Sequence, residues 1–510
     1  MDSPANEPAS PTVTIGASIG APALRGSIWT MGGYAASQIL RLAGNLILTR
    51  LLFPAVFGEM ALVFIFIQGL QMFSDVGTGP AIVQNERGDE ADFLNTAWTI
   101  QGLRGVVLWL ASWAIAWPVA EFYGQPMYRW LVPAAGLTAV VLGFESTATA
   151  TLQRHLRLER LTILEVAAQV VGIASTVLLA LANRWAFGAN DPSAVWAIVV
   201  GSVLSTLTRL ALSHTYLPGI RNRFRLDPEA TRQLMRFGRW IFVSTLLTFL
   251  AAQSDRLIFA KKIPIALFGV YSIAAMLAAL PTQAVLKLGG AVVFPAYSRL
   301  VGRADFKELF WRVRSPLLVG GASIVTAMIA SGPFLIRFLY DRRYEDAGWI
   351  MQYLSAMAWF QVLECTNGAA LLAKGHVRWV ALGSGIKFAS MVVLIPAGFH
   401  YGGFPGALVG LVGSELLKYL ASAWGAATAG LRGFGRDAIL TMLVAATSGA
   451  GFALGSLTGE RFPGKLPALV VATGVAIIPW LAVGFWQFGR RKSGGGWDQA
   501  GPPPAAAPEP

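Results

Sequence analysis

Apolar residues in this chain are gathered into long runs, and most charged residues lie between the runs. A helix that crosses the hydrocarbon core of a bilayer needs about 20 mostly apolar residues. Fourteen runs have this character, so we predict an all-α polytopic membrane protein with about fourteen transmembrane helices. The predicted spans are 28–52, 56–80, 94–117, 130–150, 162–182, 194–215, 240–260, 268–293, 315–338, 348–372, 378–398, 405–428, 437–458 and 466–488.

Lysine and arginine between the spans predict the orientation. With the N-terminus in the cytoplasm, the inner segments carry 23 basic residues and the outer segments carry 10. Cytoplasmic loops are enriched in Lys and Arg, so we expect both termini to be cytoplasmic.

The longest loop divides the chain. Residues 217–239 carry six arginines, and we interpret them as a basic cytoplasmic linker that contacts lipid headgroups. It separates an N-lobe of six spans, 26–216, from a C-lobe of six spans, 240–430. Residues 431–490 would form an accessory helix pair. The ends, 1–25 and 491–510, are rich in small residues and proline and predict disordered cytoplasmic tails.

Several positions recur at one offset of 211 residues in the two halves: Trp29 and Trp240, Arg50 and Lys261, Phe57 and Phe268, and Gly58 and Gly269. Each half begins on the same side of the membrane in this topology. The offsets therefore predict a parallel internal repeat, related by an axis along the membrane normal, with a cavity between the lobes.

Composition narrows the chemistry. Only 13% of residues are charged, far fewer than in a soluble domain, and the net charge of +13 is explained by basic loops rather than by nucleic-acid binding. Cys365 is the single cysteine, so no intramolecular disulfide is possible. The sequence has no metal-ligand spacing and no phosphate-binding loop, so we expect neither a cofactor nor ATP hydrolysis.

Charges inside the spans are the candidate functional residues. An ionised side chain at the bilayer centre costs about 2.5–3.5 kcal/mol on insertion scales, so these residues must face an interior. The seven basic ones are the predicted substrate-binding cavity residues: Arg41, Arg104, Arg209, Arg256, Lys287, Lys387 and Lys418. The acidic ones are Asp75, Glu145, Glu165, Asp255, Glu364 and Glu415. Asp75 and Asp255 are candidates for coupling to a proton or sodium ion.

Not every intramembrane charge points to a substrate. Arg209 and Lys287 lie near a cytoplasmic end, where the alternative is snorkelling to the headgroups. Four residues lie deeper, with few acids expected at equal depth, and predict a cationic chamber that attracts anions: Arg41, Arg104, Lys387 and Lys418. Lys418 also continues a row of small residues, Gly402, Gly406, Gly410 and Ser414, whose alternative reading is close helix packing.

Three function classes are compatible with a polytopic membrane protein: a membrane enzyme, a channel and a secondary transporter. A membrane glycan polymerase needs a large outer loop and a nucleophile or carboxylate motif, and the sequence shows neither. A channel commonly has a filter motif, which is also missing. A two-half bundle with interior charges is typical of a secondary transporter, so we expect no enzyme activity.

Five segments resemble a known family. They are GSIWTMGGYAASQILRLAGNLILTRLLFPAVFGEMALVF (26–64), VGTGPAIVQ with NTAW (76–98), LFGVYSIA (267–274), VVFPAYSRL (292–300) and FLIRFLYDRRYEDAGWIMQYLS (334–355). They are similar to Wzx-type polysaccharide flippases, the polysaccharide transporter branch of the MOP superfamily, near the succinoglycan and colanic acid exporters.

The resemblance implies two six-helix lobes around a central cavity, in the inner membrane of a bacterium. It implies movement of an undecaprenyl-pyrophosphate-linked oligosaccharide to the outer leaflet by alternating access, for exopolysaccharide or O-antigen synthesis. Membrane lipids, a polysaccharide polymerase and a chain-length regulator would be partners. The alternative is a related exporter of lipid II or of a small molecule.

Overall fold

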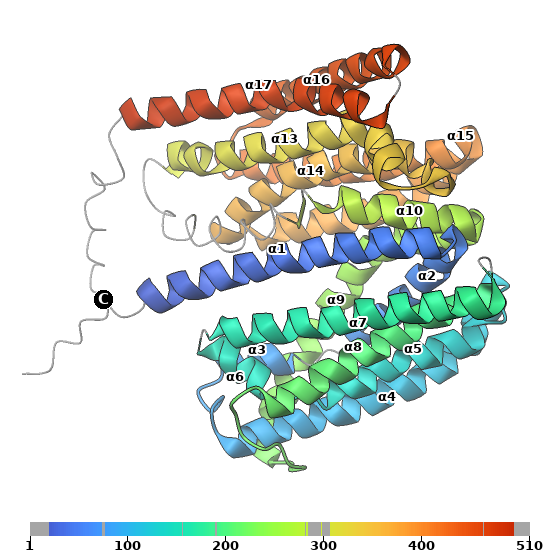
Figure 1. The fold of residues 1–510 in the computed structure, drawn as a ribbon. Helices are drawn as coiled ribbons and strands as arrows, with labels where there is room; N and C mark the ends of the chain where they lie inside the picture. Colours follow the sequence, from blue (N-terminus) through green and yellow to red (C-terminus); the bar gives the residue numbers. More distant parts are fainter. Residues whose placement is uncertain are drawn as a thin grey trace, which may run out of the picture. The chain divides into compact units, whose positions relative to one another are not determined.

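The computed structural model describes residues 20–73, 77–155, 157–188, 191–280, 282–283, 297, 306–462 and 464–493, and every regular element among them is a helix (Figure 1). Asp75, Lys287 and most of both predicted tails lie outside the described residues. The chain divides into two compact units. One comprises Met1–Leu51 and Val63–Thr245, and the other comprises Leu52–Leu62 and Leu246–Pro510. We call them the N-unit and the C-unit.

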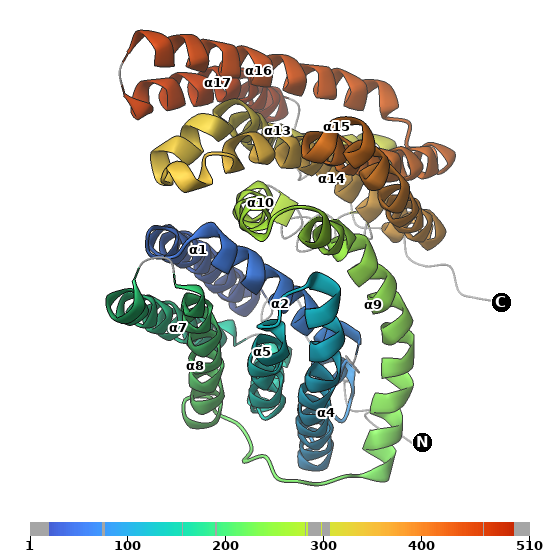
Figure 2. The ribbon, with the colours of Figure 1, turned by 90° about the vertical axis from the view of Figure 1, so that its right-hand side faces the viewer.

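The N-unit is built from helices paired side by side. Its elements are α1 (Gly20–Leu51), the second half of α2 (Pro54–Phe73), α3 (Thr78–Gln84), α4 (Ala91–Tyr123), α5 (Tyr128–Gly143), α6 (Ala148–Arg154), α7 (Leu158–Phe187) and α8 (Val195–Thr215). Helix α4 packs along α5, and α7 packs along α8 (Figure 2). A Cβ on Gly105 of α4 would lie 2.6 Å from the Ala139 carbonyl oxygen of α5. Small residues at such crossings let membrane helices approach closely, because lipid offers no hydrophobic force between them.

The linker lies along α4 before α9 begins. Backbone N–H groups of Arg223 and Asp227 donate to Asn95 and Thr96 side chains at 2.8 and 3.0 Å. Helix α9 (Pro228–Lys262) then starts inside the predicted linker and continues from the N-unit into the C-unit.

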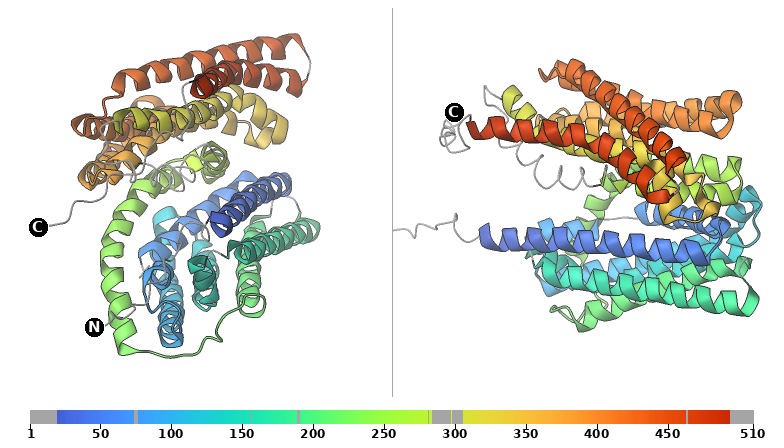
Figure 3. Two further views of the ribbon diagram at one scale, coloured as in Figure 1. Left: turned by 90° about the vertical axis from the view of Figure 1, so that its left-hand side faces the viewer. Right: turned by 45° about the horizontal axis from the view of Figure 1, so that its top comes forward.

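The C-unit continues with α10 (Ile265–Ala278), α13 (Phe306–Leu339), α14 (Ala347–Ala373), α15 (Val377–Thr428), α16 (Phe434–Arg461) and α17 (Lys465–Ser493). Helices α16 and α17 pack against each other and against α13 (Figure 3). The core there includes Trp359 of α14 and Trp480 of α17, each 2% exposed, and the fully buried Val325 of α13.

Helix α15 is two helices joined by a break. Gly402 and Gly403 have non-helical dihedral angles, and Gly403 has a φ of 59°, a region that favours glycine. A Cβ on Gly406 would lie 2.2 Å from the Gly398 carbonyl oxygen, and one on Gly410 would lie 2.3 Å from that of Leu394. The arm after the break therefore runs back along the arm before it. Close packing explains Gly406 and Gly410 of the predicted row, whereas Gly402 serves the break.

The all-α polytopic membrane fold is confirmed. Among the described residues, eight helices are long and apolar enough to cross a membrane, or nine if the bent pair α5 and α6 is one span. Helices α1 and α14, where two further spans are predicted, are not among them, and residues 240–248 of the span predicted in α9 lie outside the residues whose side chains the structure describes. Polar and charged residues interrupt the apolar runs of α1 and α14, such as Arg41 in α1 and Glu364 with Asn367 in α14.

Two glycines of the predicted repeat touch each other in the C-unit. A Cβ on Gly58 of α2 would lie 2.2 Å from the Ile265 carbonyl oxygen, and one on Gly269 of α10 would lie 1.9 Å from that of Pro54. Pro54 and Ile265 are themselves 211 residues apart. The crossing is thus locally two-fold symmetric. Of the other repeat positions, Trp29 is 40% exposed, and the Trp240 side chain lies outside the described residues.

The N-terminal end of α2 also contacts η3 (Arg342–Tyr344), the short helix that follows α13. The buried Tyr344 hydroxyl donates to the Leu52 carbonyl at 3.2 Å, and its ring contacts Phe57 edge-on. Burial raises the pKa of Tyr344, so the phenol keeps its proton and its hydrogen bond at neutral pH.

Candidate functional site

The break in α15 brings two predicted charges together. Lys387 lies on the first arm and Glu415 on the second, and their Nζ and Oε2 atoms are 2.6 Å apart. The Glu415 side chain is fully buried and that of Lys387 is 13% exposed. A single buried charge would be costly, so each group makes the burial of the other tolerable.

Lys418 forms a second pair, one turn further along the second arm. Its Nζ lies 3.0 Å from Glu364 Oε2 of α14 and 3.9 Å from Glu415 Oε1. Glu415 therefore lies between two lysines. No hydrogen bond reaches Glu415 Oε1 among the described residues, so this oxygen depends on charge attraction alone.

Polar neighbours extend this cluster across α14. Gln361 donates to Glu415 Oε2 at 3.3 Å and accepts a hydrogen bond from Thr282 at 3.0 Å. Glutamine can serve as donor and acceptor at once, so it connects the ion pairs to the chain that follows α10.

A cavity of about 150 Å³ opens beside Lys387 and Gln361, and it brings Asp255 and Arg256 of α9 to the same site. Asp255 is 8% exposed and accepts a hydrogen bond of 2.5 Å from Tyr271 of α10. The other oxygen of Asp255 has no hydrogen-bond partner among the described residues. Arg256 donates to Gln253 at 3.2 Å.

The cationic chamber is not what the structure shows at this cluster. We expected few acidic residues at the depth of Lys387 and Lys418. This expectation is wrong, because each lysine is paired with a glutamate. Across the cluster and the cavity beside it, three cations stand against three carboxylates: Arg256, Lys387 and Lys418 against Asp255, Glu364 and Glu415. The site is therefore close to neutral.

The N-unit holds the other predicted basic residues. Arg104 of α4 donates to the Gln71 carbonyl at 2.6 Å, and it lines a cavity of about 170 Å³ between α4 and α5. Arg209 of α8 pairs with Glu145 at 2.9 Å, so an ion pair rather than snorkelling alone accounts for it. Arg41 is an exposed residue of α1, for which no ion pair is found among the described residues.

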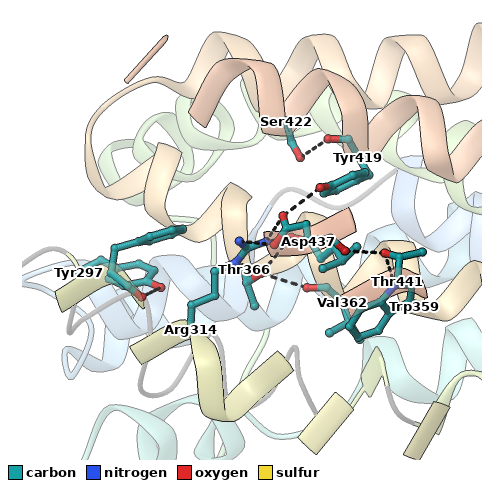
Figure 4. Close-up of polar contacts among 11 residues, drawn as sticks. Tyr297, Arg314, Trp359, Val362, Thr366, Tyr419, Ser422, Asp437 and Thr441 are labelled. Carbon is teal, nitrogen blue, oxygen red and sulfur yellow. Dashed lines mark hydrogen bonds and ion pairs between the residues drawn. The ribbon is translucent and has the colours of Figure 1, made fainter. Parts of the chain in front are cut away.

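Sequence analysis missed a further ion pair, which is fully buried. Arg314 of α13 is fully buried and donates to both carboxylate oxygens of Asp437 of α16, each at 2.9 Å (Figure 4). Arg314 also donates to Thr366 of α14 at 2.9 Å, and Tyr419 of α15 donates to Asp437 at 2.9 Å. Four helices thus meet at one guanidinium–carboxylate pair. We refer to it as the Arg314–Asp437 knot.

A signal for the Arg314–Asp437 knot was present in the sequence. Arg314 and Asp437 each stand at the cytoplasmic end of a predicted span, 315–338 and 437–458, and so at equal expected depth. Opposite charges at one depth are candidates for pairing. Arg314 falls just outside the predicted span 315–338, so it is one of the 23 basic residues of the inner segments and not one of the intramembrane charges.

Solved structures share the fold of this protein. The fold is similar to "Lipid II flippase MurJ, inward closed conformation", with a TM-score of 0.66 and 13% identity over 92% of this chain and 99% of that chain. It is also similar to an inward-facing MATE family transporter of the MOP superfamily, with a TM-score of 0.59 and 16% identity over 80% of this chain and 96% of that chain. The chain therefore has the fold of MOP superfamily transporters.

Residues 47–348, more than half of the chain, match the family model described as "Polysaccharide biosynthesis protein". The chain belongs to this family. It is 22% identical to "Lipopolysaccharide biosynthesis protein WzxC" of Escherichia coli (strain K12) over 65% of this chain and 66% of that protein. It is 24% identical to "Succinoglycan biosynthesis transport protein ExoT" of Rhizobium meliloti (strain 1021) over 56% of this chain and 54% of that protein. Each alignment spans less than two thirds of the relative. The resemblance to polysaccharide transporters is confirmed.

Proposed function

We propose that this protein moves an undecaprenyl-pyrophosphate-linked oligosaccharide from the cytoplasmic to the outer leaflet of a bacterial inner membrane. The family and the names of the relatives support a role in polysaccharide export. The observation that carries the proposal is the pair of buried lysines, Lys387 and Lys418, held by carboxylates beside a polar cavity. A diphosphate is the kind of anion that can compete for such lysines.

The neutral cluster provides a resting state for this transport. Without cargo, Glu415 and Glu364 neutralise the lysines, so the cavity carries no uncompensated charge. An arriving pyrophosphate brings its own negative charge and can replace the carboxylates as partner of Lys387 or Lys418. Such an exchange keeps each buried charge paired, and pairing is what lowers the cost of burial.

The proposal includes the wider organisation predicted from sequence. Fourteen spans form an N-lobe of 26–216, a C-lobe of 240–430 and an accessory pair within 431–490, with both termini cytoplasmic. The lobes alternate access to a cavity between them, and the lipid tail stays in the bilayer. Arg256 lines the cavity beside Lys387, and the remaining predicted cavity residues serve cargo at other stages of its passage: Arg41, Arg104, Arg209 and Lys287. A polymerase and a chain-length regulator receive the exported unit.

Coupling to a cation fits Asp255 best among the described residues. Its carboxylate is buried, and one oxygen has no hydrogen-bond partner there, so a proton or sodium ion would complete its bonding. Asp75 is the counterpart that we propose for the first half of the chain. An Asp255→Asn variant would bind cargo yet lose the dependence of transport on an ion gradient.

The test is flipping by the purified full chain in liposomes that contain a fluorescent undecaprenyl-pyrophosphate oligosaccharide. We expect wild-type protein to expose the sugar to an added glycosidase, and Lys418→Gln to slow this roughly tenfold, because a charged hydrogen bond to phosphate is worth about 1.5–3 kcal/mol. Lys465→Gln, at the exposed start of α17, is the matched control and should behave as wild type. Equal rates for Lys418→Gln and wild type, or flipping of lipid II alone, would contradict the proposal.

A further inference from the structure

A cavity of about 1080 Å³ lies away from the charged cluster. The start of α13, the end of α15 and the start of α16 enclose it. Leu420, Ala423 and Trp424 of α15 line it and follow the spacing of one helix face. Leu420 stands about 200° around the helix from Lys418, so the cavity opens on the face opposite the charged cluster.

The rim of this cavity is basic. Lys307, Arg432 and Arg436 line it, together with a single carboxylate, that of Glu308. All three cations are exposed, and no salt bridge to any of them is found in the part of the chain that the structure describes. Arg436 instead lies over the Trp311 ring at 4.7 Å. The rim thus has an excess of positive charge that no protein carboxylate neutralises there.

The walls are apolar. Trp424 is 68% exposed and Phe434 is 58% exposed, and both line the cavity. Tryptophan is enriched where membrane helices meet the headgroups, because its ring suits a half-apolar environment. A basic rim above apolar walls matches a molecule with an anionic head and a hydrocarbon body.

The floor is rigidly built. A Cβ on Gly433 would lie 2.7 Å from the Trp311 ring, so the chain entering α16 passes directly against this tryptophan. Arg314 lies below, 5.1 Å from the Trp311 ring centre, and belongs to the Arg314–Asp437 knot. The Trp311 side of the cavity is therefore backed by the Arg314–Asp437 knot.

We propose that this cavity binds a phospholipid with an anionic headgroup. The phosphate contacts Lys307, Arg432 and Arg436, and the first part of the acyl chains lies on Leu420 and Trp424. Basic pockets between membrane helices are known to bind acidic headgroups, and each Lys or Arg near an acidic lipid adds to the attraction. This site is separate from the proposed cargo route, because it uses the other face of α15.

The test is native mass spectrometry of the full chain with dioleoylphosphatidylglycerol, and with dioleoylphosphatidylcholine as the neutral lipid. We expect wild type to retain phosphatidylglycerol selectively. The variant Lys307→Gln/Arg432→Gln/Arg436→Gln should bind it at least about tenfold more weakly, since three attractions are lost. The matched control removes three exposed cations elsewhere in the C-unit, Arg342→Gln/Arg461→Gln/Lys465→Gln, and should bind as wild type.

A second variant, Ala423→Trp, fills the cavity and leaves its cations in place. It should also lose phosphatidylglycerol, whereas Leu443→Trp on an exposed face of α16 should not. Equal retention of the two lipids, or unchanged binding in both cavity variants, would overturn the proposal. Stoichiometric displacement of phosphatidylglycerol by undecaprenyl pyrophosphate would overturn it as well, because the cavity would then belong to the cargo. Failure of oligosaccharide flipping in liposomes leaves this lipid measurement unaffected, so the two proposals fail separately.

Discussion

Lys418 shows how strongly a buried charge depends on its partner. It lies between Glu364 and Glu415, on two different helices, and only 19% of its side chain is exposed. In such a setting the identity of the charge matters less than the presence of an opposite one.

Reversing the pair tests this dependence. Lys418→Glu alone should destabilise the protein by roughly 3–5 kcal/mol, because three carboxylates would then crowd one site. The double variant Lys418→Glu/Glu364→Lys restores an opposite pair and should recover most of the thermal stability in detergent. If the double variant melts no higher than the single one, the pair does not act as a unit. Flipping should stay impaired in the double variant, since the cation has moved to α14.

The Arg314–Asp437 knot has a different expected signature. Asp437→Asn leaves the Arg314 charge buried without a counterion, and we expect a loss of roughly 3–5 kcal/mol. Arg314→Met/Asp437→Leu removes both charges and should be more stable than Asp437→Asn, because no charge is then left unpaired. Thermal melting of the purified variants measures both. A double variant that melts lower than the single one would contradict this account.

Residue types and depths were readable from sequence, but pairings were not. The glutamates beside Lys387 and Lys418 were identified as intramembrane acids, yet their contacts depend on how α15 folds back and where α14 lies. A single sequence gives depth along a span, and it gives the facing direction only relative to the same helix. The neutral cluster was therefore misread as a cationic chamber.

Helices α2 and α10 approach each other as closely as backbones can. We expect Gly269→Ala to displace the crossing, because the new methyl group would stand 1.9 Å from the Pro54 carbonyl oxygen, where no side chain can give way. Small-to-large changes in packed sites cost about 1–3 kcal/mol.

The matched control is Gly320→Ala on α13, where nothing lies within 4 Å of the new Cβ. Melting of the two variants in detergent separates a steric effect from a general effect of losing glycine. Equal melting temperatures would mean that α2 and α10 do not meet in the folded protein.

Elements were easier to predict than contacts. Apolar runs placed the helices, and the break of α15 at Gly402 and Gly403 falls between the predicted spans 378–398 and 405–428. The bend of 60° between α5 and α6 was not anticipated, because residues 130–150 read as one continuous span. Hydropathy reports whether a segment prefers lipid, and a bend within such a segment leaves that average unchanged.

Orientation is a property of the whole molecule and is directly testable. The bias of basic residues predicts that residues 217–239 and 299–314 face the cytoplasm and that residues 339–347 face outward. Cysteines introduced at 224 and 342, in a variant that lacks Cys365, should therefore react differently with an impermeant maleimide in intact cells. Only the one at 342 should be labelled. Labelling at 224 would reverse the topology, and labelling of both after lysis is the control.

The superfamily could be predicted from sequence, but the number of spans could not be read from apolarity alone. Polar and charged residues inside α1 and α14, such as Arg41 and Glu364, lower the mean hydropathy of these two helices. The five family-like segments still identified the superfamily, because a motif depends on the order of its residues and not on their mean hydropathy.

The crossing of Gly58 with Gly269 has a meaning for the origin of the chain. A contact in which Gly58 meets the carbonyl of Ile265, while Gly269 meets that of Pro54, is what a symmetric dimer of one shorter polypeptide would make at its axis. Gene duplication followed by fusion would preserve that contact and leave the linker as the joint. If this history is correct, the present protein should tolerate being expressed as two separate polypeptides cut near residue 220. The two fragments should associate in the membrane through contacts such as the crossing of α2 with α10.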